Sequence, residues 1–136
     1  PILVYKYNIN IVIMKESINI IKTNNKFYNV YEIDAYIFNL LFGYKIMDNN
    51  KVGFPDSVYN KIINTLEDNT INYNVIFRDK DNIIKDFKNR NNYLKFKDRA
   101  LEKIDIDNKV NMIIDKIKKC NKNDLEKLFY IIYLLF

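Results

Sequence analysis

The sequence predicts an α/β (α+β) domain, a small mixed β-sheet flanked by helices, with an α-helical C-terminal tail. Two observations lead to this prediction. Up to residue 77, short segments of strand-like alternation are interleaved with segments of helical periodicity, whereas only helical periodicity follows. The 136 residues are 49% hydrophobic and include only 2 Gly and 2 Pro, which is typical of one compact domain with its own core.

Two short strands, over residues 18–22 and 26–31, open the predicted sheet, and the polar residues 23–25 between them are typical of a hairpin turn. Side chains alternate across a strand. The second strand is therefore expected to have one face of Phe27, Asn29 and Tyr31 and another of Lys26, Tyr28 and Val30. An aromatic side chain and an amide thus share a face.

Residues 32–43 follow with apolar side chains at helical spacing. Glu32 and Asp34 stand in the first turn, where the helix dipole favours acidic side chains, and Gly43 ends the helix. We therefore interpret Asp34 as a helix-start residue.

Three more elements complete the predicted sheet domain. Residues 44–47 and 51–54 are expected to form a second hairpin. Asp56 or Ser57 then caps a helix whose buried stripe is Val58, Ile62 and Leu66. Residues 72–77 alternate as a strand with one apolar face.

Beyond residue 77 the chain is predicted to be helical and basic, with helices over 93–104 and 107–119. The second of these has an expected core face of Val110, Ile113, Ile114 and Ile117. Asn123, followed by Glu126, resembles the capping box of a last helix with a wide apolar face.

The predicted organisation has three parts. Residues 1–13 are interpreted as an upstream or processed segment, and residues 14–90 as the α/β domain. Residues 91–136 are expected to form a helical extension packed on the same domain.

Positive charge is segregated along the chain. The net charge is +5, yet residues 1–72 carry seven basic and seven acidic side chains, so the excess lies in residues 73–136. The densest part runs from Arg78 to Arg99 and is interleaved with the aromatic residues Phe87, Tyr93 and Phe96. Such a mixture of basic and aromatic side chains is suited to contacting phosphates and stacking on bases. A solvated face over a hydrophobic seam is the alternative interpretation.

The composition also limits the chemistry. With no histidine, the chain has no histidine general base, no His-containing triad and no His-ligated metal. The single Cys120 excludes a disulfide framework and a cysteine metal cluster, and it fits the reducing cytoplasm, where we expect the protein to be located. No cofactor is expected. An enzyme would depend on carboxylates that show no convergent spacing, such as Asp34, Asp79, Asp81 and Asp86.

The stretch from Lys26 to Tyr36 reads Lys-Phe-Tyr-Asn-Val-Tyr-Glu-Ile-Asp-Ala-Tyr, and Val-Gly-Phe-Pro follows at residues 52–55. These motifs resemble the first domain of the bacterial mismatch-repair protein MutS, where a Gly-Asp-Phe-Tyr-Glu segment runs into an Asp-Ala helix and then a Gly-x-Pro turn. The resemblance covers about residues 18–77. It implies a MutS domain I-like fold and contact with DNA.

The resemblance also implies roles for individual residues. Phe27 matches the aromatic that stacks on a mispaired base, and Asn29 replaces the glutamate that hydrogen-bonds that base. Asn29 keeps the hydrogen-bonding capacity but not the charge. The strand pattern leaves open that Phe27 is instead a core residue. The expected phosphate contacts are Lys26, Arg78, Lys85, Lys88 and Arg90.

We therefore expect a small, stand-alone, non-enzymatic DNA-binding protein similar to the MutS mismatch-recognition domain, with mismatched or single-stranded DNA as its partner. The alternative is a protein-interaction or regulatory module that keeps the fold without reading DNA. Asn29 and the apolar run 128–136 favour that alternative, in which the C-terminal helix mediates homo-oligomer or protein contacts. The same run is too short to span a bilayer, so no membrane partner is expected.

Overall fold

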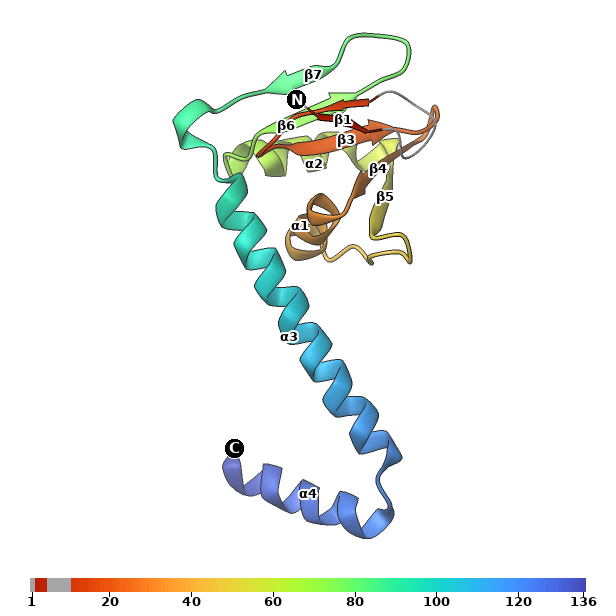
Figure 1. Ribbon diagram of the computed structural model, residues 1–136, viewed down its shortest axis with the longest axis vertical. Coiled ribbons are helices and arrows are strands. Elements are labelled where there is room, and N and C mark those ends of the chain that lie inside the picture. Colours follow the sequence, from red (N-terminus) through yellow and green to blue (C-terminus); the bar gives the residue numbers. More distant parts are fainter. Residues whose placement is uncertain (1, 5–10) are drawn as a thin grey trace. The chain divides into compact units, whose positions relative to one another are not determined.

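The computed structural model describes the backbone of residues 2–4 and 11–136 (Figure 1). It describes the side chains of residues 14–136. The chain divides into two compact units, Pro1–Leu101 and Glu102–Phe136. The segment 1–13, interpreted above as upstream or processed sequence, contains β1 (Ile2–Val4) and β2 (Ile11–Ile13), which pair antiparallel. Its remaining residues lie outside the described part of the chain.

A mixed five-stranded sheet forms the centre of the first unit, in the order β5-β4-β3-β6-β7. The strands are β3 (Ile18–Lys22), β4 (Phe27–Tyr31), β5 (Lys51–Pro55), β6 (Tyr73–Ile76) and β7 (Ile83–Lys85). Neighbouring strands are antiparallel except for β3 and β6, which run parallel with Ile18 opposite Tyr73. The mixed sheet confirms the predicted α/β fold.

Helices pack on one face of this sheet through aromatic side chains. Phe38 of α1 (Ile33–Phe42) stacks on Phe54 of β5 with ring centroids 5.7 Å apart. Tyr59 of α2 (Tyr59–Asp68) stacks on Tyr28 of β4 at 5.0 Å. The fully buried core includes Ile18, Ile20, Val30, Val52, Ile62, Leu66 and Val75. Tyr93, Phe96 and Ala100, from the start of α3 (Tyr93–Lys119), join the same core.

Gly43 ends α1 as predicted, because its φ of 71° lies in the left-handed region that favours glycine. Asp34 lies in the first turn of α1, yet it is buried rather than solvated. Its role is therefore more than that of a helix-start residue.

Of the expected second hairpin, the strand 51–54 is confirmed as part of β5, whereas the strand 44–47 and the helix cap are wrong. Of residues 44–47 only Met47 pairs, in a single bridge to Lys51. Asp56 and Ser57 do not cap α2, because they form the 3-10 turn η1 (Asp56–Val58) before it and no side chain caps the helix at Val58. The Asp56 carboxylate instead accepts a hydrogen bond from the hydroxyl of Tyr28 at 2.8 Å.

Strand β6 is buried on both faces rather than one. Asn74 is 1% exposed, and its Nδ2 donates a hydrogen bond to Oδ1 of Asn19 on the neighbouring strand β3 at 3.1 Å. Strand β7 was not predicted, because its exposed three-residue sequence has no buried face to give a periodic signal.

The expected break between residues 104 and 107 is also wrong, since α3 is continuous from Tyr93 to Lys119. Two i,i+4 ion pairs bridge the break, Lys103–Asp107 at 2.7 Å and Lys109–Asp105 at 2.9 Å. Such pairs stabilise a helix through residues of poor intrinsic propensity. Helix α4 (Lys122–Leu135) is capped by Asn121 rather than Asn123, because the Asn121 side chain accepts a hydrogen bond from the N–H of Asp124 at 2.8 Å.

Apolar side chains in the second unit are exposed. Val110, Ile113 and Ile114, predicted to face a core, are solvent-accessible, and so are the α4 residues Phe129, Tyr130, Ile131, Ile132, Tyr133, Leu134 and Leu135. Of the segment 91–136, Tyr93, Phe96 and Ala100 pack into the core of the α/β domain, whereas packing of residues 102–136 on it stays a prediction. Within the described residues, every helix is too short or too polar to span a membrane.

Candidate nucleic-acid interface

Phe27, the first residue of β4, exposes its aromatic ring. It is 47% exposed, whereas its neighbours Tyr28 and Val30 are 3% and 0% exposed. The predicted alternation of faces along this strand is therefore confirmed. Tyr28, not Phe27, is the aromatic residue that β4 contributes to the core.

Hydrogen bonds of the β3–β4 turn fix the backbone on which this ring stands. Oδ1 of Asn24 accepts from the N–H groups of Lys26 at 2.8 Å and Phe27 at 3.1 Å. The carbonyl of Phe27 accepts from the N–H of Thr23 at 3.0 Å, and that of Lys26 from the N–H of Asp56 at 2.7 Å. Phe27 is thus an exposed aromatic residue on an ordered turn, which lowers the entropy lost when a partner binds.

Asn29 lies on the same face of β4 as Phe27 and is half-buried. Gly53 of β5 is opposite it, and a Cβ placed on Gly53 would lie 2.9 Å from Oδ1 of Asn29. The glycine therefore leaves the room that the amide occupies. Nδ2 of Asn29 donates to the hydroxyl of Tyr31 at 3.2 Å, so the amide is oriented along the strand.

Three cations surround a cavity of about 380 Å³ at the end of the sheet where the parallel strands β3 and β6 terminate. The cavity is lined by Lys22, Thr23, Asn24, Asn25, Phe77, Arg78, Asp79 and Lys80. Nζ of Lys80 lies 4.2 Å and Nζ of Lys22 lies 6.0 Å from the ring centroid of Phe77. Among the described residues, no carboxylate forms an ion pair with Lys22, Arg78 or Lys80.

Three other predicted phosphate contacts, Lys85, Lys88 and Arg90, lie at the opposite end of the sheet, where β6 begins. Strand β7 runs antiparallel to β6 and places Lys85 opposite Tyr73, at the start of β6, while Arg78 follows its end. Nζ of Lys85 lies 3.7 Å from a carboxylate oxygen of Glu67. Phe87 lies near two of these cations, since Nζ of Lys85 is 5.3 Å and the guanidinium carbon of Arg90 5.9 Å from its ring centroid.

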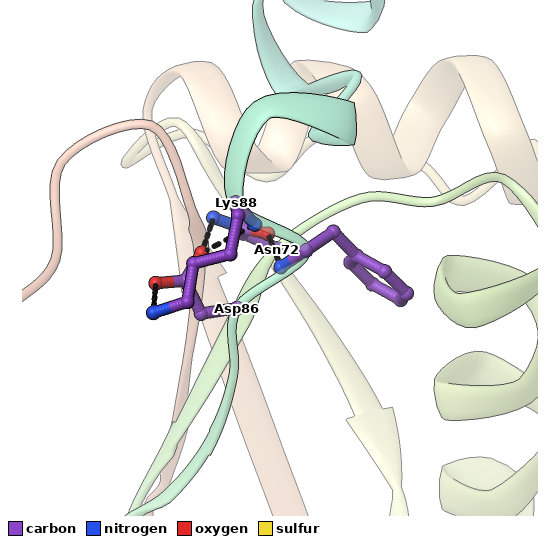
Figure 2. Close-up of polar contacts among 4 residues, drawn as sticks. Asn72, Asp86 and Lys88 are labelled. Carbon is purple, nitrogen blue, oxygen red and sulfur yellow. Dashed lines mark hydrogen bonds and ion pairs between the residues drawn. The ribbon is translucent and has the colours of Figure 1, made fainter.

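Lys88 belongs to a polar cluster that organises the chain after β7 (Figure 2). The Asp86 carboxylate accepts hydrogen bonds from the N–H of Lys88 at 2.8 Å, from its Nζ at 3.2 Å and from Nδ2 of Asn72 at 3.2 Å. The backbone hydrogen bond is the largest of the effects that hold the pKa of Asp86 below its usual range. Lys88 adopts a φ of 57° here, so the cluster maintains an unfavourable backbone conformation.

The structure thus separates the predicted site residues. Lys26, Phe27 and Arg78 lie at the end of the sheet where β3 and β6 terminate. Lys85, Lys88 and Arg90 lie at the opposite end, and Asn29 lies within β4. Lys80 lies in the Arg78–Arg99 segment that the sequence predicts to contact phosphates, whereas Lys22 was not predicted as a site residue. The signal that would have found Lys22 is its place at the end of a strand, next to a polar turn.

Asp34 is the most perturbed carboxyl group near these elements. Its oxygens accept hydrogen bonds from the N–H of Asn19 at 2.9 Å and the hydroxyl of Tyr93 at 2.8 Å. Burial raises the pKa of Asp34 to about 7, against the opposing effect of these hydrogen bonds. Within the described residues, no group of three or more acidic or cysteine side chains is arranged to hold a metal ion.

Comparison of the chain with models of protein families, with curated proteins and with solved structures finds no match.

Proposed function

We propose that this chain is a non-enzymatic, cytoplasmic DNA-binding protein that works like the mismatch-recognition domain of MutS, with Phe27 as its base-stacking residue. The observation that carries the proposal is the exposure of Phe27, which is 47% exposed on an ordered turn. An aromatic ring of this kind lies ready to stack on a base without removing a side chain from the core.

The chemistry around Phe27 supports the same function. An apolar wedge unstacks a base step at a cost of a few kcal/mol, which stacking on the ring and the contacts of a bent duplex offset. Asn29 shares the face of Phe27 and offers an amide donor and acceptor to a base edge. Lys26, in the turn that leads into β4, is exposed, and we assign a phosphate contact to its ammonium group.

Phe27→Ala tests this function. We expect the variant to keep the wild-type melting temperature, because the ring is outside the core, and to bind DNA more weakly by ~1–3 kcal/mol, the usual contribution of one base–aromatic stack. Fluorescence anisotropy with mismatched, fully paired and single-stranded oligonucleotides measures the loss.

Phe87→Ala is the matched control, since Phe87 is another aromatic residue, beside two cations at the opposite end of the sheet. The proposal predicts that its DNA affinity is unchanged. Equal affinities of wild type and Phe27→Ala for all three DNA forms would rule out the stacking role.

A second candidate function is protein interaction through α4. The exposed apolar side chains of this helix favour it, because large apolar surfaces that are accessible to solvent commonly mark binding sites for other proteins. This function does not depend on Phe27 and is tested separately below.

A further inference from the structure

The cavity lined by Lys22, Arg78 and Lys80 lies where two parallel strands end. Ile21 of β3 is opposite Ile76 of β6, so the segments that follow both strands leave the sheet at the same edge. Open α/β sheets bind ligands at this edge, because the departing loops leave a crevice there. The volume of about 380 Å³ falls within the range of roughly 300–1,000 Å³ found for small-molecule sites.

The charge of the lining identifies the class of ligand. Three cations and one carboxylate, Asp79, give the cavity a formal charge of +2. A phosphate monoester carries about −1.5 to −2 at pH 7, whereas an internal phosphodiester carries a single negative charge. The monoester therefore matches the cavity more closely.

The polar side chains of the lining add uncharged donors. Because Oδ1 of Asn24 accepts from the N–H groups of Lys26 and Phe27, the orientation of its amide is fixed, and its Nδ2 group remains for a ligand. Asn25 contributes a second, exposed amide. Cation–π attraction to Phe77 holds the ammonium group of Lys80 beside the cavity, and the ammonium group of Lys22 lies 5.2 Å from the ring centroid of Tyr28 and 6.0 Å from that of Phe77.

From this geometry we infer that the cavity binds a phosphate monoester, carried either by a mononucleotide or by the phosphorylated end of a nucleic-acid strand. The cations neutralise the phosphate, and the amides of Asn24 and Asn25 contact the adjoining sugar or base. The inference goes beyond the proposed function, since the cavity is lined by none of the residues assigned to base stacking.

The first experiment titrates the full chain, labelled with ¹⁵N, with deoxyadenosine monophosphate and, in parallel, with deoxyadenosine. We expect saturable shifts of the backbone amides of residues 22–25 and 77–80 with the monophosphate only. In the second experiment, an oligonucleotide with a 5′-phosphate is compared with the same oligonucleotide ending in a hydroxyl. A preference of about tenfold or more for the phosphorylated end would identify a strand end as the source of the phosphate.

Arg78→Gln and Lys22→Gln should each weaken binding of the monophosphate by about tenfold, the value of one charged hydrogen bond. Lys88→Gln is the matched control, because it removes a cation that pairs with Asp86 at the opposite edge of the sheet. We expect it to bind the monophosphate as the wild type does. Well-dispersed amide spectra of all three variants establish that they are folded.

Monophosphate binding without a preference for the phosphorylated oligonucleotide would support the inference, with a free mononucleotide as the ligand. Absence of shifts with the monophosphate together with equal affinity for the two oligonucleotides would overturn it. Phe27→Ala separates the two hypotheses, since the cavity should still bind the monophosphate when base stacking is lost.

Discussion

Asp34 connects three elements through one buried carboxyl group. It belongs to the first turn of α1, and it accepts hydrogen bonds from the backbone of Asn19 in β3 and from the side chain of Tyr93 at the start of α3. Burial opposes ionisation, so the pKa in the folded chain is about 7, above the value of about 3.9 in an unfolded chain. The folded state therefore binds the Asp34 proton more tightly than the unfolded state does.

This difference predicts the pH dependence of stability. The stabilisation by protonated Asp34 is complete below about pH 4 and is lost as the pH rises towards 7, by up to roughly 1.4 kcal/mol per pH unit. In Asp34→Asn, whose amide resembles the protonated acid, we expect this part of the slope to disappear. Urea unfolding of wild type and variant at several pH values between 4 and 7 measures it.

Asp56→Asn serves as the control for this experiment. Asp56 also accepts a hydrogen bond from a tyrosine hydroxyl, that of Tyr28, but it is exposed. We expect the variant to keep the slope that Asp34 causes. A slope in Asp34→Asn equal to that of wild type would contradict the assignment.

At the scale of elements, the fold gathers two sets of cations at opposite ends of the sheet. Lys22, Arg78 and Lys80 gather where β3 and β6 end, without a carboxylate partner among the described residues. In the other set, Lys85 pairs with Glu67 and Lys88 with Asp86. A cation already neutralised by a carboxylate releases fewer counterions when it meets a phosphate, so the first set should contribute more to DNA binding.

Two triple variants compare the sets. Replacing Lys22, Arg78 and Lys80 with Gln should reduce the slope of log affinity against log salt concentration by about 2 to 3, since each phosphate contact contributes about 0.9 for duplex DNA. Replacing Lys85, Lys88 and Arg90 with Gln should change the slope by less than about 1. Binding of one duplex, measured at four or more salt concentrations, gives both values.

The second triple variant also tests whether Lys85, Lys88 and Arg90 contact phosphates, as the sequence predicts. If the variant at Lys85, Lys88 and Arg90 loses more of the salt dependence than the variant at Lys22, Arg78 and Lys80, DNA binds at the end of the sheet where β6 begins. If both variants keep the wild-type slope, neither set of basic side chains contacts phosphates.

At the scale of the whole chain, α4 belongs to the second unit, Glu102–Phe136. Its apolar side chains, Phe129 and Leu134 among them, are exposed. If the first unit is stable without α4, truncation after Lys127 should leave its melting temperature unchanged. If α4 mediates contact between copies of the chain, the truncated protein should elute later from a sizing column than its loss of mass explains.

Light scattering at several protein concentrations provides the mass for that comparison, with Tyr133→Lys as a milder variant that keeps the chain length. A fall in melting temperature on truncation would show instead that α4 covers the α/β domain, as the sequence predicts. Equal elution and equal stability would leave α4 without a role in either.

The alternation of β4 made Phe27 and Asn29 predictable as neighbours on one face, and Gly43 marked the end of α1. The burial of Asn72 and Asn74 was not predictable, because polar residues in a strand indicate a solvated face unless their hydrogen-bond partners are known. The cavity was not predictable either. Lys22 and Lys80 meet only because β3 pairs with β6, and nothing in the local sequence specifies which strands become neighbours.

The parallel pairing of β3 with β6 also has a consequence for the order of events during synthesis. The β3–β4–β5 meander is complete once Pro55 has left the ribosome, whereas β3 gains its second neighbour only when Tyr73–Ile76 follow. Until then one side of β3 has unpaired N–H and C=O groups, an open edge that can recruit a strand from another nascent chain. The hydrogen bond between the side chains of Asn19 and Asn74 then favours the correct register. A strand from another chain with an apolar residue at this position could not form a hydrogen bond with the Asn19 amide.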